Sequence, residues 1–305
     1  MAALYYASPM LTRRTMIRRT AAAAGLLGLQ GVLSRADAAI IPSPYGPLAP
    51  KHAEENQGVV LSLPPDFRYR ILSRADDVLD DGNRSPRLPD AMGAFAVGNE
   101  IRLVRNHEVK ELAMPLSPGP WSYDSFAGGG TTTLVVDPIT RTTTRRFVSL
   151  SGTVGNCAGG PTPWGTWITC EETVSGVGPF GKSHGYCFEV PASANSAVVA
   201  TPIPSMGRFI HEAAAVDPQT GIVYLTEDQD RCGLYRWLPN VPFNLAAGGR
   251  LQMLAIENAP TYDAATGQTV NSYLSVTWVD IANPDPPNAA SNPAAVYEQG
   301  RARGG

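Results

Sequence analysis

One stretch of the sequence, residues 156–172, brings together a thiol, Cys157, and two adjacent carboxylates, Glu171 and Glu172. Residues 156–163 have the Gly and Pro content of a loop, and residues 164–170 have the aromatic and β-branched content of a strand. Adjacent carboxylates at a strand end repel each other unless a cation lies between them, and a thiolate prefers a soft or strongly polarising metal. The stretch therefore predicts a metal site, with a solvated strand end beside a buried cysteine as the alternative.

Side chains alternate between the two faces of a strand, so the two carboxylates are expected to leave this strand on opposite sides. The residues expected on one face are Trp167, Thr169 and Glu171, and those expected on the other are Ile168, Cys170 and Glu172.

Further acids recur at the ends of expected strands. Asn106-His107-Glu108 follows a strand at 101–105, His211-Glu212 begins another strand, and Glu227-Asp228 ends the next. Each acid alone is typical of a solvated turn, so the prediction depends on their recurrence. A cluster of carboxylates selects hard cations such as Ca²⁺ or ferric iron, and one added thiolate indicates a transition metal.

The four cysteines fall into two groups. Cys170, Cys187 and Cys232 lie in or beside expected strands, which is typical of core or disulfide residues, and three pairings of the four are open. Cys157 lies in the loop-like context Asn-Cys-Ala-Gly-Gly, which would let a thiolate approach a bound ion.

The N-terminus predicts an exported protein. Arg13-Arg14 precedes an apolar stretch at 20–33, and Ala36-Asp37-Ala38 supplies a small-x-small cleavage site, so residues 1–38 read as a Tat signal peptide. The apolar stretch is about 14 residues long, shorter than the roughly 20 that span a bilayer, so no stable membrane anchor is expected. A Sec signal that contains Arg-Arg is the alternative. The expected location is the periplasm or the exterior of the cell.

Replacing Arg13 and Arg14 together by Lys is expected to leave the precursor in the cytoplasm, because the Tat receptor reads the arginine pair rather than its charge. Cell fractionation and immunoblotting would check this result. An unchanged periplasmic yield would show that export uses another route, or that Arg18-Arg19 serves instead.

Composition narrows the function classes. The 305 residues include 43% hydrophobic and 17% charged side chains, with a net charge of −3. Gly and Pro together make up about 19% of the chain, against about 12% on average, which favours short strands joined by turns. Beyond the N-terminal cluster the basic residues are scattered, so nucleic acid is not an expected partner.

The pattern of apolar runs predicts an all-β chain. After a Pro-rich arm at 39–58, one domain at 59–305 is expected, and no amphipathic helix of normal length is evident. The expected strands are 59–63, 67–72, 101–105, 131–137, 142–150, 164–171, 185–191, 222–228, 233–239 and 273–279.

Two internal echoes favour a β-propeller over a β-sandwich. Val-Asp-Pro-x-Thr occurs at 136–140 and again 80 residues later at 216–220, which equals two units of about 40 residues, the length of a propeller blade. In the second echo, strands ending at Glu171-Glu172 and Glu227-Asp228 each lead to a Gly-led aromatic strand ending in Pro. Equivalent strand ends around one axis can line a central site.

At these residues the sequence resembles the PhoX-type alkaline phosphatases, an exported bacterial β-propeller family. The resemblance runs from about residue 46 to 305 and is carried by the segments 103–108, 156–172, 184–191, 206–213 and 223–228. It implies a monomeric, six-bladed propeller that hydrolyses small phosphate esters at a cluster of Fe³⁺ and Ca²⁺.

Residue roles follow from the same resemblance. It implies that Cys157 is a thiolate ligand of iron, that Glu212 is a catalytic carboxylate ligand, and that Asn106 faces the phosphate or calcium side. Glu171, Glu172, Glu227 and Asp228 are implied as neighbouring metal ligands, Glu171 also with a catalytic role. The family's Arg-x-Glu segment would fall after Gly305, so the chain is expected to be incomplete at its C-terminus.

The residue types agree with this chemistry, because phosphoester hydrolysis needs cations and the chain has no Gly-x-Ser-x-Gly nucleophile motif. Two alternatives stay open. One is an exported propeller that binds calcium without turnover, and the other is a calcium-dependent lactonase-like hydrolase. Neither alternative function requires Cys157 as a metal ligand, so the iron content of the protein would distinguish them from a phosphatase.

Overall fold

The computed structural model describes residues 44–305, which form two compact units that divide between Ile71 and Leu72. The predicted signal peptide at 1–38 lies outside the described residues. Within residues 44–305, no helix is both long and apolar enough to cross a membrane.

The smaller unit contains one antiparallel hairpin. β1 (Ala49–His52) pairs with β2 (Val59–Leu63), and the 3-10 helix η1 (Glu54–Asn56) lies between them. The strand predicted at 67–72 is wrong, because the backbone there makes isolated hydrogen bonds, such as the one from Glu54 N to Tyr69 O, rather than a strand ladder. The amide of Gln57 accepts a hydrogen bond from Ile71 N at 2.8 Å and donates one to Ile71 O at 3.1 Å.

The larger unit, residues 72–305, consists of three antiparallel sheets in which each strand pairs with the next strand along the chain. The first sheet comprises β3 (Pro89–Val97), β4 (Glu100–His107), β5 (Gly129–Val136) and β6 (Thr143–Thr153). The second comprises β7 (Asn156–Pro161), β8 (Thr166–Glu171) and β9 (Cys187–Pro191). The third comprises β10 (His211–Val216), β11 (Val223–Glu227), β12 (Leu234–Pro239), β13 (Gly249–Ile256) and β14 (Val276–Asp280).

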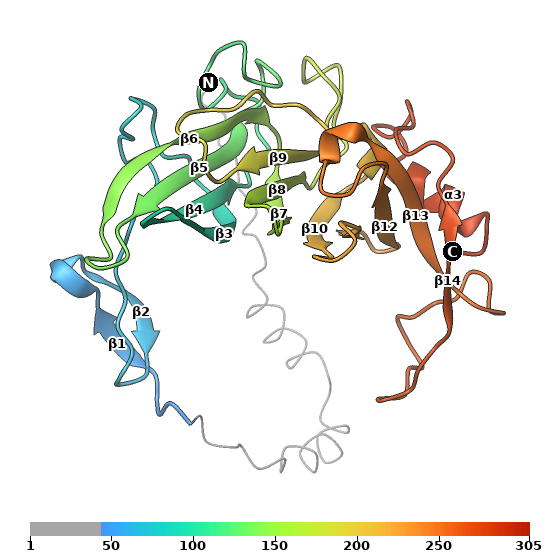
Figure 1. Ribbon diagram of the computed structural model, residues 1–305, viewed down its shortest axis with the longest axis horizontal. Helices are drawn as coiled ribbons and strands as arrows, with labels where there is room; N and C mark the ends of the chain where they lie inside the picture. Colours follow the sequence, from blue (N-terminus) through green and yellow to red (C-terminus); the bar gives the residue numbers. More distant parts are fainter. Residues whose placement is uncertain (1–43) are drawn as a thin grey trace, which may run out of the picture. The chain divides into compact units, whose positions relative to one another are not determined.

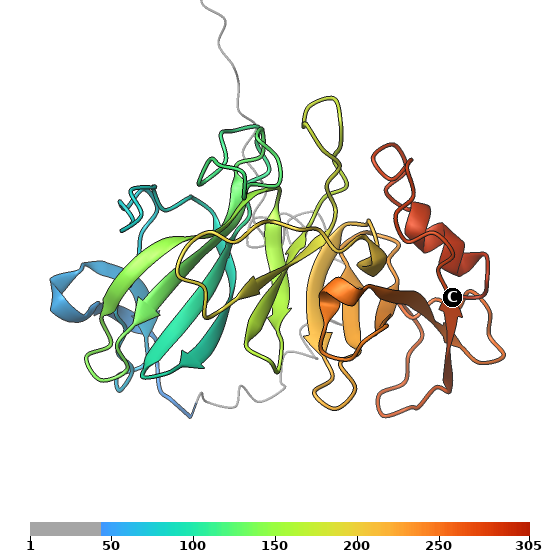
Figure 2. The ribbon, with the colours of Figure 1, turned by 45° about the horizontal axis from the view of Figure 1, so that its top comes forward.

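Within this unit the three sheets follow one another side by side (Figures 1 and 2). Their first strands adjoin, because β7 contacts both β3 and β10. Consecutive meanders whose first strands adjoin are arranged as blades of a β-propeller. The predicted all-β class is confirmed, and the described residues form three such blades without closing a ring.

Strand β8 packs against both neighbouring sheets, as its alternation predicts. Trp167 belongs to a core shared with Val104 of the first sheet, whereas Ile168 and Cys170 belong to a core shared with Leu225 of the third. The two hydrophobic cores therefore lie between blades, and β8 contributes one face to each.

Strands β3 and β7 are missing from the sequence prediction, which assigned a loop to 156–163. Their Gly and Ala content reflects close approach between first strands rather than a loop. A Cβ at Gly160 would overlap the carbonyl oxygen of Ala214 in β10, and a Cβ at Gly93 would overlap the ring of Trp167. Only glycine permits two backbones to approach this closely.

Of the two internal sequence repeats, one corresponds to equivalent positions in two blades and the other does not. In the 80-residue echo, Asp137 and Asp217 form the same hairpin turn, each accepting a hydrogen bond from the residue four positions later. The first turn joins β5 to β6 and the second joins β10 to β11, so they occupy different places in their blades and mark no blade period. The other echo is confirmed, because β8–β9 and β11–β12 are equivalent second and third strands.

The remaining elements are short. The 3-10 helices η2 (Pro204–Met206) and η3 (Leu245–Ala247) precede β10 and β13, and α3 (Ala295–Arg301) packs on β13. The sequence did not predict α3, which has seven residues and no side-chain cap at its N-terminus. Strand β13, also unpredicted, joins β12 to β14.

Candidate metal centre

The first strand of each blade begins with a β-bulge at the same place. In each case two residues of the first strand oppose one residue of the second strand. The bulged pairs are Asp90 and Ala91 in β3, Cys157 and Ala158 in β7, and Glu212 and Ala213 in β10. A bulge re-aims the side chain that it carries, and bulges are frequent beside active sites. Three blades thus present an acid or a thiol from one equivalent position.

The second strand of each blade adds another acid. Glu108, Glu172 and Asp228 come directly after the last residues of β4, β8 and β11, which pair with the residues preceding the bulges. Each blade therefore places two potential ligands at the same end of its first two strands.

These side chains converge. The Sγ atom of Cys157 lies 3.5 and 3.6 Å from the carboxylate oxygens of Glu212. Glu172, Glu212 and Asp228 each offer an oxygen within 4.8 Å of the others. Asp90 lies close enough for its charge to act on the Cys157 thiol. The structure thus brings together four of the predicted metal ligands and adds Asp90, which the sequence analysis missed.

One cation contacts this group of acids. Lys110 Nζ lies 2.7 Å from Glu172 and 2.9 Å from Glu108. Burial raises the pKa of Glu172 to about 7, with nearby Glu108 and Asp228 adding to the rise against the effect of Lys110. Burial also raises the pKa of the Cys157 thiol, helped by the charges of Asp90 and Glu212. Negative charge here is in excess, which is the condition that a bound cation relieves.

Glu171 and Glu227, both predicted as ligands, lie outside the cluster. The carboxylate of Glu171 is fully buried and accepts hydrogen bonds from the backbone N–H groups of Val154, Gly185 and Tyr186. Glu227 similarly accepts from Gly233 N at 3.0 Å. These equivalent residues hold the loop between the second and third strands of their blades, which leaves the next residue, Glu172 or Asp228, to face the cluster.

Asn106 positions the β7 bulge. Its side-chain amide donates to the carbonyl oxygens of Cys157 at 3.1 Å and Ala158 at 2.8 Å, and its oxygen accepts from Trp167 and Thr169 at 2.9 Å each. The bulge disrupts the strand ladder locally, and Asn106 supplies the hydrogen bonds that its carbonyls need. The side chain is fully buried, so the structure places it behind Cys157.

A signal for Asp90 was present in the sequence. Pro-Asp-Ala, Asn-Cys-Ala and His-Glu-Ala are each followed within two positions by a pair of small residues, at 93–94, 159–160 and 214–215. The three tripeptides correspond to the three bulges. The three tripeptides have only their final alanine in common. Their equivalence therefore becomes evident only when the strands are aligned by their pairing in the sheets.

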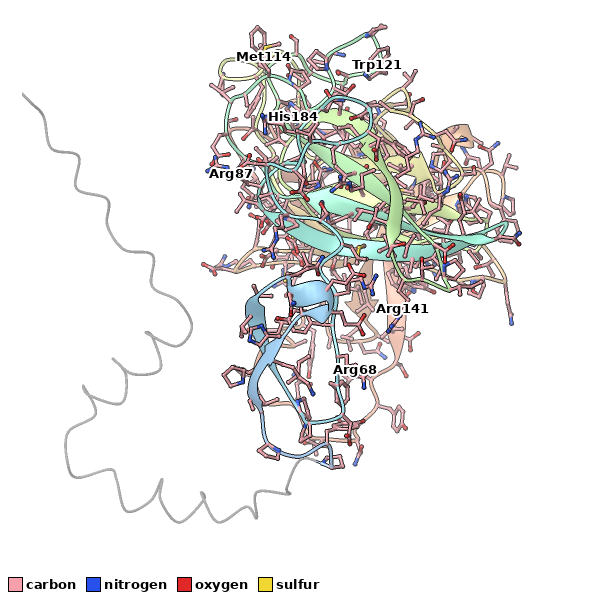
Figure 3. All side chains as sticks on the ribbon, turned by 90° about the vertical axis from the view of Figure 1, so that its left-hand side faces the viewer. Arg68, Arg87, Met114, Trp121, Arg141 and His184 are labelled. Carbon is pink, nitrogen blue, oxygen red and sulfur yellow. The ribbon has the colours of Figure 1, made fainter. Side chains whose placement is uncertain are left out.

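His184 supports Glu171 from the loop end of the blades, where Met114 and Trp121 also lie (Figure 3). Its Nδ1 lies 2.7 Å from Glu171, and its Nε2 lies 3.3 Å from Asp124. Burial alone would lower the pKa of His184, but the two carboxylates raise it above the ordinary value of 6.5.

A pH dependence of stability follows from His184. Because its folded-state pKa exceeds that of the unfolded chain, its contribution is fully present below pH 6.5 and is lost as pH rises through the folded-state pKa. Urea titrations at several pH values are expected to show that the free energy of unfolding falls more steeply with rising pH for the wild type than for His184→Gln. Parallel curves would contradict this assignment.

A separate apolar cavity of about 520 Å³ is lined by residues that include Pro191, Val199, Ile203 and Leu245. None of the bulge or strand-end acids lines it, so it is not assigned to the metal centre.

The fold and the cluster define a class: an all-β protein built of propeller blades, with a thiol and carboxylates arranged to hold metal ions. Comparison with known families places the chain within that class. The sequence model of the family described as alkaline phosphatase PhoX matches residues 126–304, more than half of the chain, so the chain belongs to the PhoX alkaline phosphatase family. The matched region contains Cys157, Glu172, Glu212 and Asp228, whereas Asp90 and Glu108 precede it.

Among solved structures, the chain is similar to Pseudomonas fluorescens PhoX in complex with vanadate, a transition state analogue. The sequence identity is 16% and the TM-score is 0.48. The similarity covers 72% of this chain and 54% of the other, so the chain spans about half the length of that protein. No curated protein matches the chain.

Proposed function

We propose that the chain is an exported, metal-dependent phosphatase that hydrolyses small phosphate esters at the cluster around Cys157 and Glu212. One observation carries the proposal: three equivalent β-bulges converge, and they place a thiol among carboxylates from three blades. Membership of the PhoX family supports the same reaction class.

The donor set fits two kinds of ion. Glu172, Glu212 and Asp228 form an all-oxygen group of the type that Ca²⁺ takes, and the thiol of Cys157 adds the softer donor expected for Fe³⁺. Glu212 contacts Cys157 and also belongs to the oxygen group, so its carboxylate is placed to serve both ions. Bound cations would neutralise phosphate oxygens and activate an oxygen nucleophile.

The other residues of the chain act by positioning. The ion pair with Lys110 fixes the orientation of Glu172, and the hydrogen bonds from Asn106 fix the bulge that carries Cys157. Glu171 holds the loop that begins at Glu172. In this proposal Asn106 and Glu171 support the site without touching substrate, whereas Glu212 is a ligand within it.

The proposal includes export through the Tat pathway to the periplasm or beyond, as a monomer. This location suits an enzyme that releases phosphate from esters outside the cytoplasm. It also suits a metal centre that is loaded before export, because the Tat route carries folded cargo.

The test is hydrolysis of p-nitrophenyl phosphate by the purified full-length protein, with iron and calcium measured in the same preparation. We expect Glu212→Gln to lower the rate by at least about 100-fold, since it removes an anionic ligand from both ions. The exposed Glu257→Gln is the matched control and should leave the rate unchanged. A preparation that holds both metals but does not hydrolyse the ester would refute the proposed function.

A second candidate is a propeller that binds calcium alone, either without turnover or as a lactonase-like hydrolase. The all-oxygen group of Glu172, Glu212 and Asp228 favours this second candidate, because that group does not include Cys157. Calcium without iron, with no ester hydrolysis, would favour binding alone, and hydrolysis of a lactone under the same conditions would favour the lactonase.

A further inference from the structure

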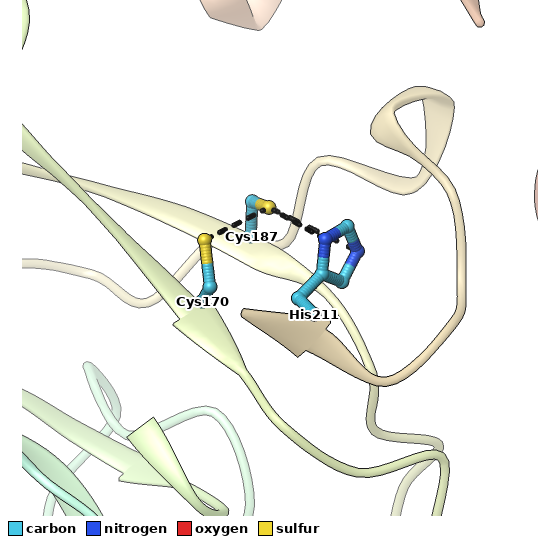
Figure 4. Close-up of side chains that lie close together, drawn as sticks. All are labelled: Cys170, Cys187 and His211. Atoms are coloured by element: carbon cyan, nitrogen blue, oxygen red, sulfur yellow. Dashed lines mark hydrogen bonds between the residues drawn. The ribbon is translucent and has the colours of Figure 1, made fainter. Parts of the chain in front are cut away.

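A second group of potential ligands lies in the core between two blades. Cys170 of β8, Cys187 of β9 and His211 of β10 point toward one another, and all three are fully buried (Figure 4). Cys170 and Cys187 belong to the hydrophobic core that the second and third sheets share. None of them belongs to the carboxylate cluster, and the proposed phosphatase reaction does not use them.

The distances match a tetrahedral metal site. Cys187 Sγ lies 3.6 Å from Cys170 Sγ and 3.6 Å from His211 Nδ1, and one ligand atom from each residue falls within 4.8 Å of the others. Zn²⁺ binds thiolate sulfur at about 2.3 Å and imidazole nitrogen at about 2.0 Å, which separates neighbouring ligands by roughly 3.4 to 3.8 Å. Two of the three ligand separations therefore fall in the range of a single Zn²⁺ site.

The imidazole of His211 is held in the form that a metal requires. Its Nε2 lies 3.0 Å from the carbonyl oxygen of Gly207, and because a carbonyl can only accept, Nε2 carries the hydrogen. Nδ1 is then the unprotonated nitrogen. Cys187 Sγ lies 3.6 Å from Nδ1 and 3.9 Å from Nε2, so the sulfur faces the side of the ring, and the ring has to turn before the Nδ1 lone pair points at an ion beside Cys187. A backbone carbonyl that orients the second nitrogen is typical of metal-bound histidine.

Charge balance also favours a divalent ion. Two thiolates and one neutral imidazole carry a charge of −2, so Zn²⁺ gives a neutral complex that an apolar core can bury. Binding transfers one proton from each thiol to solvent.

We propose that Cys170, Cys187 and His211 form a structural Zn²⁺ site that ties the second blade to the third. The site lies beside the carboxylate cluster in sequence, since Cys170 precedes Glu171-Glu172 and His211 directly precedes Glu212. A bound ion would therefore restrain the strands that carry Glu172 and Glu212. A disulfide between Cys170 and Cys187, which oppose each other in the strand ladder, is the competing outcome.

Zinc analysis of the full-length protein tests this site. After dialysis with Zn²⁺ and removal of loosely bound metal, we expect about one thiol-dependent zinc per chain in a Cys157→Ser, Cys232→Ser background, where Cys170 and Cys187 are the remaining thiols. Adding Cys187→Ser should abolish it. Zinc retained after that change, or no zinc in the background protein, would overturn the proposal.

Cobalt gives an independent readout that does not require the Cys187 variant to fold. In the same background, Co²⁺ should produce the sulfur-to-metal charge-transfer and visible d–d bands of a tetrahedral thiolate site. Absence of these bands would count against the site. Denaturing mass spectrometry with thiol alkylation completes the test, because a disulfide would leave Cys170 and Cys187 unalkylated and would overturn the proposal.

Discussion

Replacing Cys157 by Ser is expected to reduce both bound iron and phosphate-ester hydrolysis by at least about 100-fold. The Cys157 thiol lies within 3.6 Å of Glu212 and is the one soft donor in the cluster of described residues. A serine hydroxyl is too weak an acid to replace a thiolate as an anionic ligand. The carboxylates of Glu172, Glu212 and Asp228 remain, so calcium should be retained.

Cys232→Ser is the matched control, because Cys232 is exposed and stands outside both groups of potential ligands. Its iron content and rate should equal those of the wild type. Cys187→Ser should instead lower stability, since its thiol is buried in the core between blades. Iron and activity that persist in the Cys157 variant would end the assignment of this thiol to the metal centre.

Replacing Asn106 by Ala is expected to destabilise the fold by roughly 3 to 5 kcal/mol, because each buried group left without a partner costs about 1 to 3 kcal/mol. The substitution removes four hydrogen bonds at once, two of which the Asn106 amide donates to the carbonyl oxygens of Cys157 and Ala158. Without them the bulge loses its fixed geometry, so metal binding at Cys157 should fall even under conditions where the protein stays folded.

Urea unfolding measures the stability term, and iron content of the folded variant measures the effect on the site. Asn240→Ala is the control, since Asn240 is exposed and its side chain makes one hydrogen bond, to Ala247 O. It should change stability by less than about 1 kcal/mol. If Asn106→Ala behaves like Asn240→Ala, the side chain does not hold the bulge.

Local interactions made much of the fold predictable. The Val-Asp-Pro turns formed as hairpins because the aspartate side chain bonds the backbone of its own turn, as Asp137 does with Ile139 and Thr140. The alternation of Trp167 and Ile168 between two cores followed from the pleat of a single strand. Acids were correctly expected at strand ends, and Cys157 and Glu212 were correctly grouped.

Other features were misread because their cause lies in a distant part of the chain. The glycines of β7 looked like a loop, yet Gly160 is required by the backbone of β10, more than fifty residues away. Glu171 and Glu172 looked equivalent, but the backbone of Gly185 and Tyr186 holds the buried carboxylate of Glu171, whereas Glu172 lies in the group with Glu212 and Asp228. The tripeptide that contains Asp90 gave only a weak signal, because its equivalence to the other bulges depends on the pairing of the preceding residue, Pro89, with His107 at the end of β4.

By itself, the sequence determined many of the strands, the hairpin turns and the residue types available for metal binding, because these depend on neighbours a few positions apart. The tertiary structure decided which of those residues meet. Equivalent bulges in three blades bring Asp90, Cys157 and Glu212 to one place, and the packing of the second blade against the third sets Cys187 beside His211. Contacts between blades are set by the packing of whole sheets, and no local pattern of residues encodes the distance between side chains of different blades.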